Sequence, residues 1–182
     1  MPKLIVFIVV TVLLAYVSKA SLRLPRSHGF YRFFAWQAIL GLTLLELDLW
    51  FFDPFSWHQI ISWFLLAVSL LLAIHGVRLL SRIGKQDTRR DDTPMLQFEK
   101  TTTLVTVGAY RYIRHPLYSS LLSLTWGVFF KSPFWLGGIL ALLASCFLVA
   151  TAKMEESENI RFFGAPYQAY MKQTKMFVPF LF

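Results

Sequence analysis

The sequence predicts an all-α integral membrane protein with about five transmembrane helices. Hydrophobic residues make up 56% of the 182 residues and charged residues only 15%, whereas soluble domains average about 25% charged residues. Too few polar side chains therefore remain to cover a surface that faces water. The apolar residues also fall into five stretches, and the basic residues gather in the segments between them.

Five apolar stretches are the predicted spans, in chain order Leu4–Val17, Phe33–Phe52, His58–Leu80, Leu117–Phe130 and Phe134–Ala152. The second, third and fifth hold about 19–23 residues, enough to cross a bilayer core of about 30 Å at about 1.5 Å per residue. The first and fourth hold only 14 residues. They need flanking residues or a partner helix to cross.

A break at Lys131-Ser132-Pro133 predicts that the fourth and fifth spans form a C-terminal helical hairpin, because proline cannot continue a helix. The first stretch also has the length of a signal-peptide core, with Ser18-Lys19-Ala20 as a passable cleavage site. Basic residues follow that stretch at once, however, and a basic segment resists translocation. We therefore expect the first span to be retained.

The lysines and arginines set the predicted orientation. If the five spans alternate, sixteen of the 18 fall on one side of the membrane, and only Lys3 and Lys131 fall on the other. The positive-inside rule then predicts a multi-pass protein with its N-terminus outside and its C-terminus in the cytoplasm. A net charge of +8 would also suit a nucleic-acid binder, but these basic residues lie between apolar runs. The predicted partner is the lipid bilayer and not a nucleic acid, and nothing in the sequence indicates an oligomeric state.

Most polar residues within or beside the spans have a structural explanation. Glu46 and Asp48 can reach the outer interface, and His75 lies near the inner end of the third span. His28 and His58 look like loop and boundary residues. No His, Cys or carboxylate residues show metal-ligand spacing, so no metal is predicted, and there is no glycine-rich phosphate loop.

The first of two unusual segments is Gly108–Tyr118, Gly-Ala-Tyr-Arg-Tyr-Ile-Arg-His-Pro-Leu-Tyr, just before the fourth span. It places two arginines, one histidine and three tyrosines at the cytoplasmic mouth of a helix. Pro116 suits a first helical turn, where free amide groups, together with Arg114 and His115, can meet an anion. An aromatic, basic anchor at the lipid headgroups explains the segment equally well.

The second segment, Lys153–Glu158, follows the fifth span and holds Glu155, Glu156 and Glu158. Acidic residues at a helix C-terminus oppose the helix dipole, so they indicate a positively charged partner, either a ligand or nearby Lys and Arg. A hairpin would bring the acidic and basic segments to the same cytoplasmic face. Such a site suits a zwitterion, with its carboxylate toward Arg and His and its ammonium toward Glu.

These segments resemble the isoprenylcysteine carboxyl methyltransferase family and, more broadly, the related phospholipid methyltransferases. The family pattern is Gly-x-Tyr-Arg-Tyr-x-Arg-His-Pro-x-Tyr before a helical hairpin, then a Glu-Glu pair and Phe-Gly-x-x-Tyr-x-x-Tyr. The match covers about Thr106–Pro179, with Ala109 where many relatives have Pro and Ser120 where many have Gly. The chain thus divides into 1–105, with three spans and a loop, and 106–182, the motif region, within one structural domain.

The resemblance implies that S-adenosylmethionine is the methyl donor, held in a cytoplasmic pocket at the ends of the last helices, and that a lipid-like acceptor enters from the bilayer. The implied cofactor-binding residues are Tyr110, Tyr112, Arg114, His115, Pro116, Tyr118, Glu156, Tyr167 and Tyr170. The predicted catalytic residues are Arg111 and Arg161, which would orient a carboxylate acceptor bidentately, and Glu155, which would serve an amine acceptor as a base.

The predicted function is therefore S-adenosylmethionine-dependent methyl transfer to a lipophilic, membrane-embedded acceptor. The preferred acceptor is the carboxylate of an isoprenylcysteine-like substrate, and the alternative is a phospholipid amine. The expected partner besides the bilayer is thus a lipophilic small molecule or another prenylated acceptor, and the sequence does not indicate whether prenylated proteins are substrates. Two functions of other classes are a non-catalytic membrane protein and an NADPH-dependent lipid reductase, because some sterol reductases look similar near the Arg-His-Pro segment. The polar stretch Ser81–Thr103 is either a solvated loop or a flap over the site.

Overall fold

The computed structural model describes residues 1–85, 95–96 and 99–181. The described residues form helices and no strand, apart from a single parallel bridge between Ile113 and Lys175. The helices in chain order are α1 (Pro2–Val17), α2 (Lys19–Leu22), α3 (His28–Glu46), the 3₁₀ helix η1 (Leu47–Leu49), α4 (Trp57–Ile83), the 3₁₀ helix η3 (Gly108–Arg111), α5 (Pro116–Phe129), α6 (Trp135–Phe163) and α7 (Ala165–Gln173).

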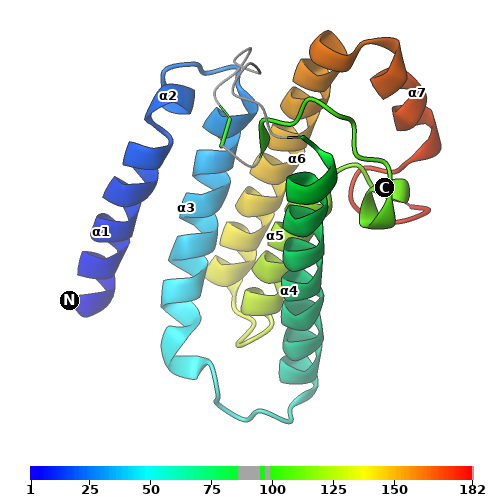
Figure 1. The fold of residues 1–182 in the computed structure, drawn as a ribbon. Helices are drawn as coiled ribbons and strands as arrows, with labels where there is room; N and C mark the ends of the chain where they lie inside the picture. The colour runs from blue at the N-terminus through cyan, green and yellow to red at the C-terminus, as the bar shows by residue number, and fades with distance from the viewer. Residues whose placement is uncertain (86–94, 97–98, 182) are drawn as a thin grey trace.

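Five helices, α1, α3, α4, α5 and α6, run alongside one another (Figure 1). The closest packing joins α3 to α6 and α4 to α5, while α1 lies at the edge against α3. Short turns at one end connect α3 to α4 and α5 to α6, and we call this the turn end. The opposite end carries α2, the segment 99–115 and α7, and we call it the charged end.

Each of the five predicted apolar stretches forms a helix, and α5 and α6 are joined by a short turn as the break at Lys131 predicts. The bounds of the second stretch were wrong. The helix α3 begins at His28 rather than Phe33, because the Ser27 hydroxyl accepts a hydrogen bond from the backbone N–H of Phe30 at 3.3 Å and caps the helix. It ends at Glu46, so the predicted helical residues up to Phe52 form η1 and a turn.

The fifth stretch is longer than predicted. The helix α6 runs for 29 residues and continues past Ala152 to Phe163. The acidic residues Glu155 and Glu156 are therefore inside the helix and not beyond its end, and this corrects the placement made from the sequence. The helix stops at Gly164, whose φ of 64° lies in the left-handed region that favours glycine.

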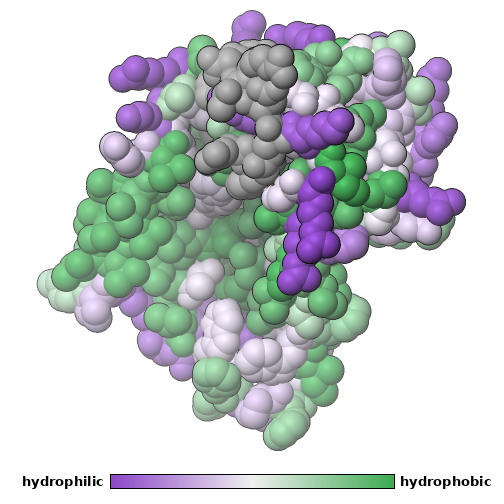
Figure 2. Space-filling model, viewed as in Figure 1, coloured by the Kyte–Doolittle hydropathy of each residue, from purple (hydrophilic) through white to green (hydrophobic). Residues whose placement is uncertain are grey.

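Two of the described helices, α4 and α6, are long and apolar enough to cross a membrane by length and composition, and the shorter α1 is also apolar. Their outward faces carry large exposed hydrophobic side chains, such as Leu13 on α1 and Phe64 and Leu71 on α4. Figure 2 shows hydrophobic residues over α1 and hydrophilic residues gathered at the charged end. A helix that is apolar on its outward face fits a lipid environment rather than water.

Small residues let the central helices approach closely. Ala35 and Ala38 on α3 and Ala141 and Ala144 on α6 are buried, and short side chains of this kind allow backbones to pack tightly in membrane bundles. This packing holds the charged end of α6, which carries the acidic residues, beside the start of α3. It therefore positions the side chains of the charged end.

Candidate functional site

A cavity opens at the charged end, with walls from α3, α4, Met95, the segment 99–105, η3, α5, α6 and α7. It encloses about 690 Å³ of empty space, including the part open to solvent. Its lining mixes apolar and aromatic side chains with a few ionisable groups. A binding site for a small polar ligand has this composition.

Arg114 forms one side of the cavity and joins three segments. Its Nε donates a hydrogen bond to Oε1 of Glu156 at 2.6 Å, and both side chains are only 10% exposed. Its Nη1 donates to the backbone carbonyl of Met171 at 3.2 Å and to that of Thr174. A guanidinium held on several sides in this way is fixed in orientation.

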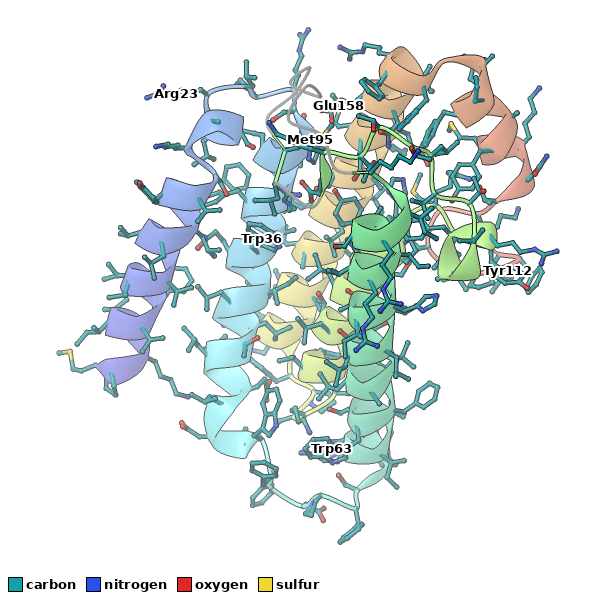
Figure 3. All side chains as sticks on the ribbon, in the orientation of Figure 1. Arg23, Trp36, Trp63, Met95, Tyr112 and Glu158 are labelled. Atoms are coloured by element: carbon teal, nitrogen blue, oxygen red, sulfur yellow. The ribbon has the colours of Figure 1, made fainter. Side chains whose placement is uncertain are left out.

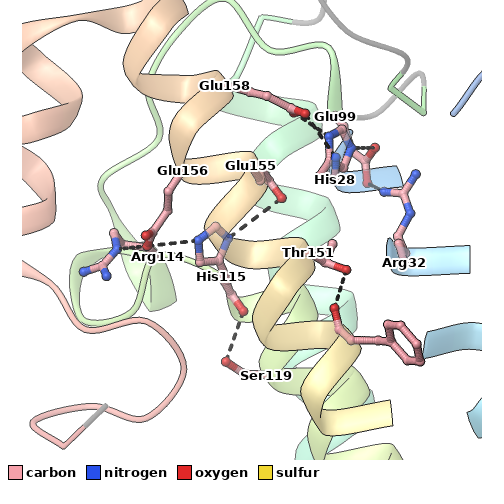
Figure 4. Close-up of polar contacts among 11 residues, drawn as sticks. His28, Arg32, Glu99, Arg114, His115, Ser119, Thr151, Glu155, Glu156 and Glu158 are labelled. Atoms are coloured by element: carbon pink, nitrogen blue, oxygen red, sulfur yellow. Dashed lines mark hydrogen bonds and ion pairs between the residues drawn. The ribbon is translucent and has the colours of Figure 1, made fainter. Parts of the chain in front are cut away.

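His115 lies between two carboxylates, as Figure 4 shows. Its Nε2 is 3.4 Å from Oε1 of Glu156, and its Nδ1 is 3.8 Å from Oε2 of Glu155. The ring stacks on Tyr118 with centroids 5.4 Å apart. The residue is buried and directly precedes Pro116, which begins α5. The imidazole therefore faces a carboxylate on each side.

Four tyrosines, Tyr110, Tyr118, Tyr167 and Tyr170, line the cavity. The hydroxyl of Tyr170 donates to the backbone carbonyl of Tyr110 at 2.6 Å, which attaches α7 to η3. Burial raises the pKa of Tyr110, Tyr167 and Tyr170 above the ordinary value of 10, and these side chains remain neutral at physiological pH. Their electron-rich faces favour a cation.

Glu155 completes this aromatic wall with a negative charge. Its side chain is 27% exposed and lines the cavity. Its carboxylate is near enough to help raise the pKa of Tyr110 and Tyr167. A carboxylate among aromatic faces is suited to bind a positively charged group from the cavity.

A second ionic cluster closes the cavity on the side of α3. Glu158 accepts hydrogen bonds from the backbone N–H of His28 at 3.0 Å and from its ring Nδ1 at 2.5 Å. The Nε2 of His28 lies 3.6 Å from Oε2 of Glu99, and Oε1 of Glu99 pairs with Arg32 (Figure 4). The cluster thus joins α3, α6 and the segment that precedes the motif.

In this cluster, ion pairing shifts the pKa values of His28 and Glu99 more than burial does. Burial alone would lower the pKa of His28, but the carboxylates of Glu158 and Glu99, with Glu155 farther away, raise it to about 9. Burial alone would raise the pKa of Glu99, but Arg32 and His28 lower it. His28 is therefore charged at neutral pH, although only 1% of it is exposed.

The structure brings most of the predicted site residues together. Those that line the cavity are Tyr110, Arg114, His115, Tyr118, Glu155, Tyr167 and Tyr170. Glu156 stands behind them in the ion pair with Arg114, and Pro116 is buried in the first turn of α5.

Three predicted residues lie apart from the cavity. Arg111 lines an open groove beside α7, with Pro166 and Gln173. Tyr112 is 48% exposed, and Arg161 is exposed near the end of α6. The sequence placed all three at the site because they lie in or beside the motif segments. Arg111 belongs to the same turn η3 as the cavity residue Tyr110, but it lines the groove and not the cavity.

Sequence reasoning missed His28, Arg32, Glu99 and Glu158 as site residues. It placed His28 at a boundary, yet this residue lines the cavity together with Glu99. The centre of the predicted flap, residues 86–94 and 97–98, lies outside the described residues. Basic residues at the start of an apolar helix, together with an acid such as Glu99 in the segment between spans, are the signal that could have suggested this cluster. Within the described part of the chain, no group of three or more His, Cys, Asp or Glu is placed to hold a metal.

Comparison with known proteins agrees with the sequence motif. The family model for phospholipid methyltransferase matches residues 57–165, from the start of α4 to the start of α7. The chain belongs to this family. The resemblance inferred from the sequence is thereby confirmed, and membership implies S-adenosylmethionine as the methyl donor.

Methanethiol S-methyltransferase of Crocosphaera subtropica is 25% identical to this chain over 158 residues. The alignment covers 82% of this chain and 55% of the relative, so the chain spans about half the length of that protein. No solved structure matches this chain. His28 and Arg32 lie outside the range matched by the methyltransferase family model, whereas the Arg114–Glu156 pair lies inside it.

Proposed function

We propose that this chain transfers a methyl group from S-adenosylmethionine to a lipophilic acceptor at the membrane. The observation that carries the proposal is the Glu155 carboxylate within a cavity walled by tyrosines. A sulfonium donor carries a positive charge, and aromatic faces with a carboxylate favour such a charge. The paired ionic groups beside this wall suit the amino-acid end of the same molecule.

The lining residues divide between the two ends of the donor. Glu155 and the tyrosine faces would hold its positive groups, and Arg114 and His115 would hold its carboxylate. The donor supplies an electrophilic methyl group when it is bound. The protein aligns the acceptor with it and excludes water, which are the main protein contributions to a direct displacement.

The position of the ionisable groups favours an acceptor that must lose a proton. Glu155 and His115 line the cavity and can accept a proton, whereas Arg111 and Arg161, the candidates for orienting a carboxylate, lie outside it. A thiol and an amine both lose a proton on methylation. The relative from Crocosphaera is named for a thiol acceptor. We therefore favour a lipophilic thiol or amine, with an isoprenylcysteine-like carboxylate as the alternative.

We further propose that the five long helices cross the bilayer with the charged end toward the cytoplasm and the N-terminus outside. Sixteen of 18 lysines and arginines then face the cytoplasm. A water-soluble donor would reach the cavity from the cytoplasm, and the acceptor would reach it from the lipid. Reporter fusions at Phe182 and within the 53–57 turn should show opposite sidedness, and equal sidedness would contradict this arrangement.

Ligand-induced stabilisation tests the class of enzyme. S-adenosylhomocysteine at 100 times its dissociation constant should stabilise the detergent-solubilised protein by about 2.7 kcal/mol, and NADPH should have no effect. Stabilisation by NADPH alone would instead identify a lipid reductase. No stabilisation by either compound would contradict the proposal.

The acceptor is tested with a radiolabelled donor and three lipophilic compounds: hexadecanethiol, phosphatidylethanolamine and N-acetyl farnesylcysteine. Glu155→Gln keeps the side-chain volume but removes the base, so turnover of a thiol or amine at saturating donor should fall by roughly 10²–10⁴-fold. Glu46→Gln, at the turn end, is the matched control and should retain turnover. Methylation of the carboxylate compound alone would restore the alternative acceptor.

A further inference from the structure

The motif arginine that lies outside the cavity, Arg111, stands beside an exposed apolar surface. Its guanidinium carbon is 6.0 Å from the centroid of the Tyr112 ring, and that ring is 6.2 Å from the ring of Phe180. Phe180 is 82% exposed and Leu181 is 78% exposed. We call Tyr112, Val178, Phe180 and Leu181 the C-terminal patch. Figure 3 shows Tyr112 at the outer edge of the molecule.

The surroundings of the C-terminal patch are basic. The two stretches that form it, residues 107–115 and 172–181, contain the cations Arg111, Arg114, Lys172 and Lys175 and no acidic residue. Arg114 is paired with Glu156. Arg111 and Lys175 are exposed. An apolar and aromatic surface beside exposed cations is complementary to the headgroup region of an anionic bilayer.

The depth of the C-terminal patch is set by its attachment to α4. The backbone N–H of Ala109 in η3 donates to Nε2 of His75 at 3.3 Å. A Cβ on Gly108 would lie 2.5 Å from that nitrogen and 2.7 Å from Cδ1 of Leu79, so η3 packs directly against α4 there. These α4 residues are the last turns of the predicted third span, which ends at Leu80. If the third span ends at Leu80 as the sequence predicts, this contact places η3, and the patch beside it, near the edge of the bilayer core.

We propose that the C-terminal patch and Arg111 form an anchor in the headgroup layer of an anionic leaflet. Tyr112 and Phe180 lie among the headgroups, where aromatic side chains are enriched, and Arg111 binds a lipid phosphate. This role goes beyond the proposed methyl transfer and rests on the membrane placement of α4. It also gives Arg111 a position in the motif without a contact to the reacting groups.

The anchor is connected to the cavity through the backbone. The N–H of Arg114 donates to the carbonyl of Lys175 at 2.8 Å, and the N–H of Lys175 donates to the carbonyl of Tyr112 at 3.0 Å. The N–H of His115 donates to the carbonyl of Met176 at 3.2 Å. Insertion of the patch into the headgroup layer thus fixes Arg114 and His115, the two cavity residues whose backbone is bonded to this segment. An anionic bilayer should tighten donor-site binding for this reason.

The depth of the anchor is measured on the full chain in nanodiscs of phosphatidylcholine and phosphatidylglycerol. In a Cys146→Ser background, a nitroxide is attached to Phe180→Cys or, as the matched control, to Gln168→Cys on the exposed face of α7. The label at 180 should be relaxed more by oxygen, and the label at 168 more by a water-soluble nickel chelate. Equal nickel access at both positions would refute the anchor. The anchor would also be refuted if the label at 180 were shielded from both reagents, and only in discs that hold two copies of the chain. A second chain would then cover the patch.

The coupling is measured by the affinity for S-adenosylhomocysteine in nanodiscs with and without phosphatidylglycerol. The anionic lipid should tighten binding by about fivefold, the factor for one cation at an anionic surface, and Arg111→Ala should abolish this response. Phe180→Ser should also reduce the response, yet retain the affinity of the parent protein in detergent. If phosphatidylglycerol tightened the binding of S-adenosylhomocysteine to Arg111→Ala as much as to the parent protein, the proposal would be overturned. The depth measurement requires no methyl transfer, so it can fail or succeed independently of the proposed function.

Discussion

Buried charge is neutralised differently at the two ends of the bundle. At the charged end, the cations that line the cavity face carboxylates, as in the pairs Arg114–Glu156 and His28–Glu158. At the turn end, Lys131 is only 1% exposed, and its Nζ donates to the amide oxygen of Gln59 at 3.0 Å. The same Nζ stands 3.0 Å from the centroid of the Trp63 ring; Figure 3 shows Trp63 at this end of α4.

This difference indicates that the turn end has a structural role and that the charged end is a binding site. The amide nitrogen of Gln59 donates to the backbone carbonyls of Phe52 and Lys131, each at 3.0 Å. Lys131 and Gln59 therefore tie the α3–α4 turn to the α5–α6 turn. At the charged end, ion pairs instead surround a cavity. A charged group of a ligand can there replace one partner of such a pair. Substitutions at the turn end should change stability, and those at the charged end should also change binding.

The largest effect is expected for Arg114→Ala. Truncating one partner of a buried charge pair costs about 2–5 kcal/mol in binding, which corresponds to a loss of about thirtyfold to several-thousandfold in affinity. Isothermal titration with S-adenosylhomocysteine measures this loss. Glu156→Ala should behave similarly, because it leaves the guanidinium without its carboxylate partner.

Lys131→Met should lower stability by about 2–4 kcal/mol, since it removes a desolvated cation–π contact and leaves the Gln59 amide oxygen unsatisfied. The affinity for S-adenosylhomocysteine should remain unchanged, because the site lies at the other end of the bundle. Thermal unfolding in detergent and titration of the same sample give both quantities. If Lys131→Met lost as much affinity as Arg114→Ala, the two ends would not differ in the way described.

The charged end should also show a pH dependence that His28 sets. His28 precedes the apolar stretch that begins at Phe33, and its pKa is raised from 6.5 to about 9 by Glu158 and Glu99 against the effect of burial. Its ion pairing therefore contributes fully below pH 6.5 and is lost as the pH rises through 9. The contribution is at most about 3 kcal/mol.

Thermal unfolding of the parent protein and of His28→Gln, from acidic pH to above pH 9, tests this expectation. The groups that face His28 are Glu158, Glu99, the more distant Glu155, and Arg32 beside Glu99. The stability difference between the two proteins should shrink as the pH rises through 9. A difference that does not vary with pH would show that His28 contributes through packing and not through its charge.

Local patterns in the sequence were sufficient for the helices and for the motif residues. Apolar stretches located every long helix, and the order of the motifs placed Arg114, His115 and Glu155 at one site. The same patterns could not predict the cluster around His28, because it forms between partners far apart in the chain. His28 pairs with Glu158 across 130 positions, and Arg32 pairs with Glu99 across 67. These pairs form only when α3 packs against α6 and the segment that holds Glu99 lies beside both helices.

The smallest expected effect separates two tyrosines of the motif region. Tyr170→Phe removes the hydroxyl that donates to the buried carbonyl of Tyr110 and should destabilise the protein by about 0.5–1.5 kcal/mol. Because this hydrogen bond attaches α7 to η3 at the cavity wall, the affinity for S-adenosylhomocysteine should also fall, by up to about tenfold. Tyr112→Phe is the matched control. Its ring lies outside the cavity, so its affinity in detergent should equal that of the parent protein. Equal effects of the two substitutions on binding would show that the hydroxyl of Tyr170 has no part in shaping the site.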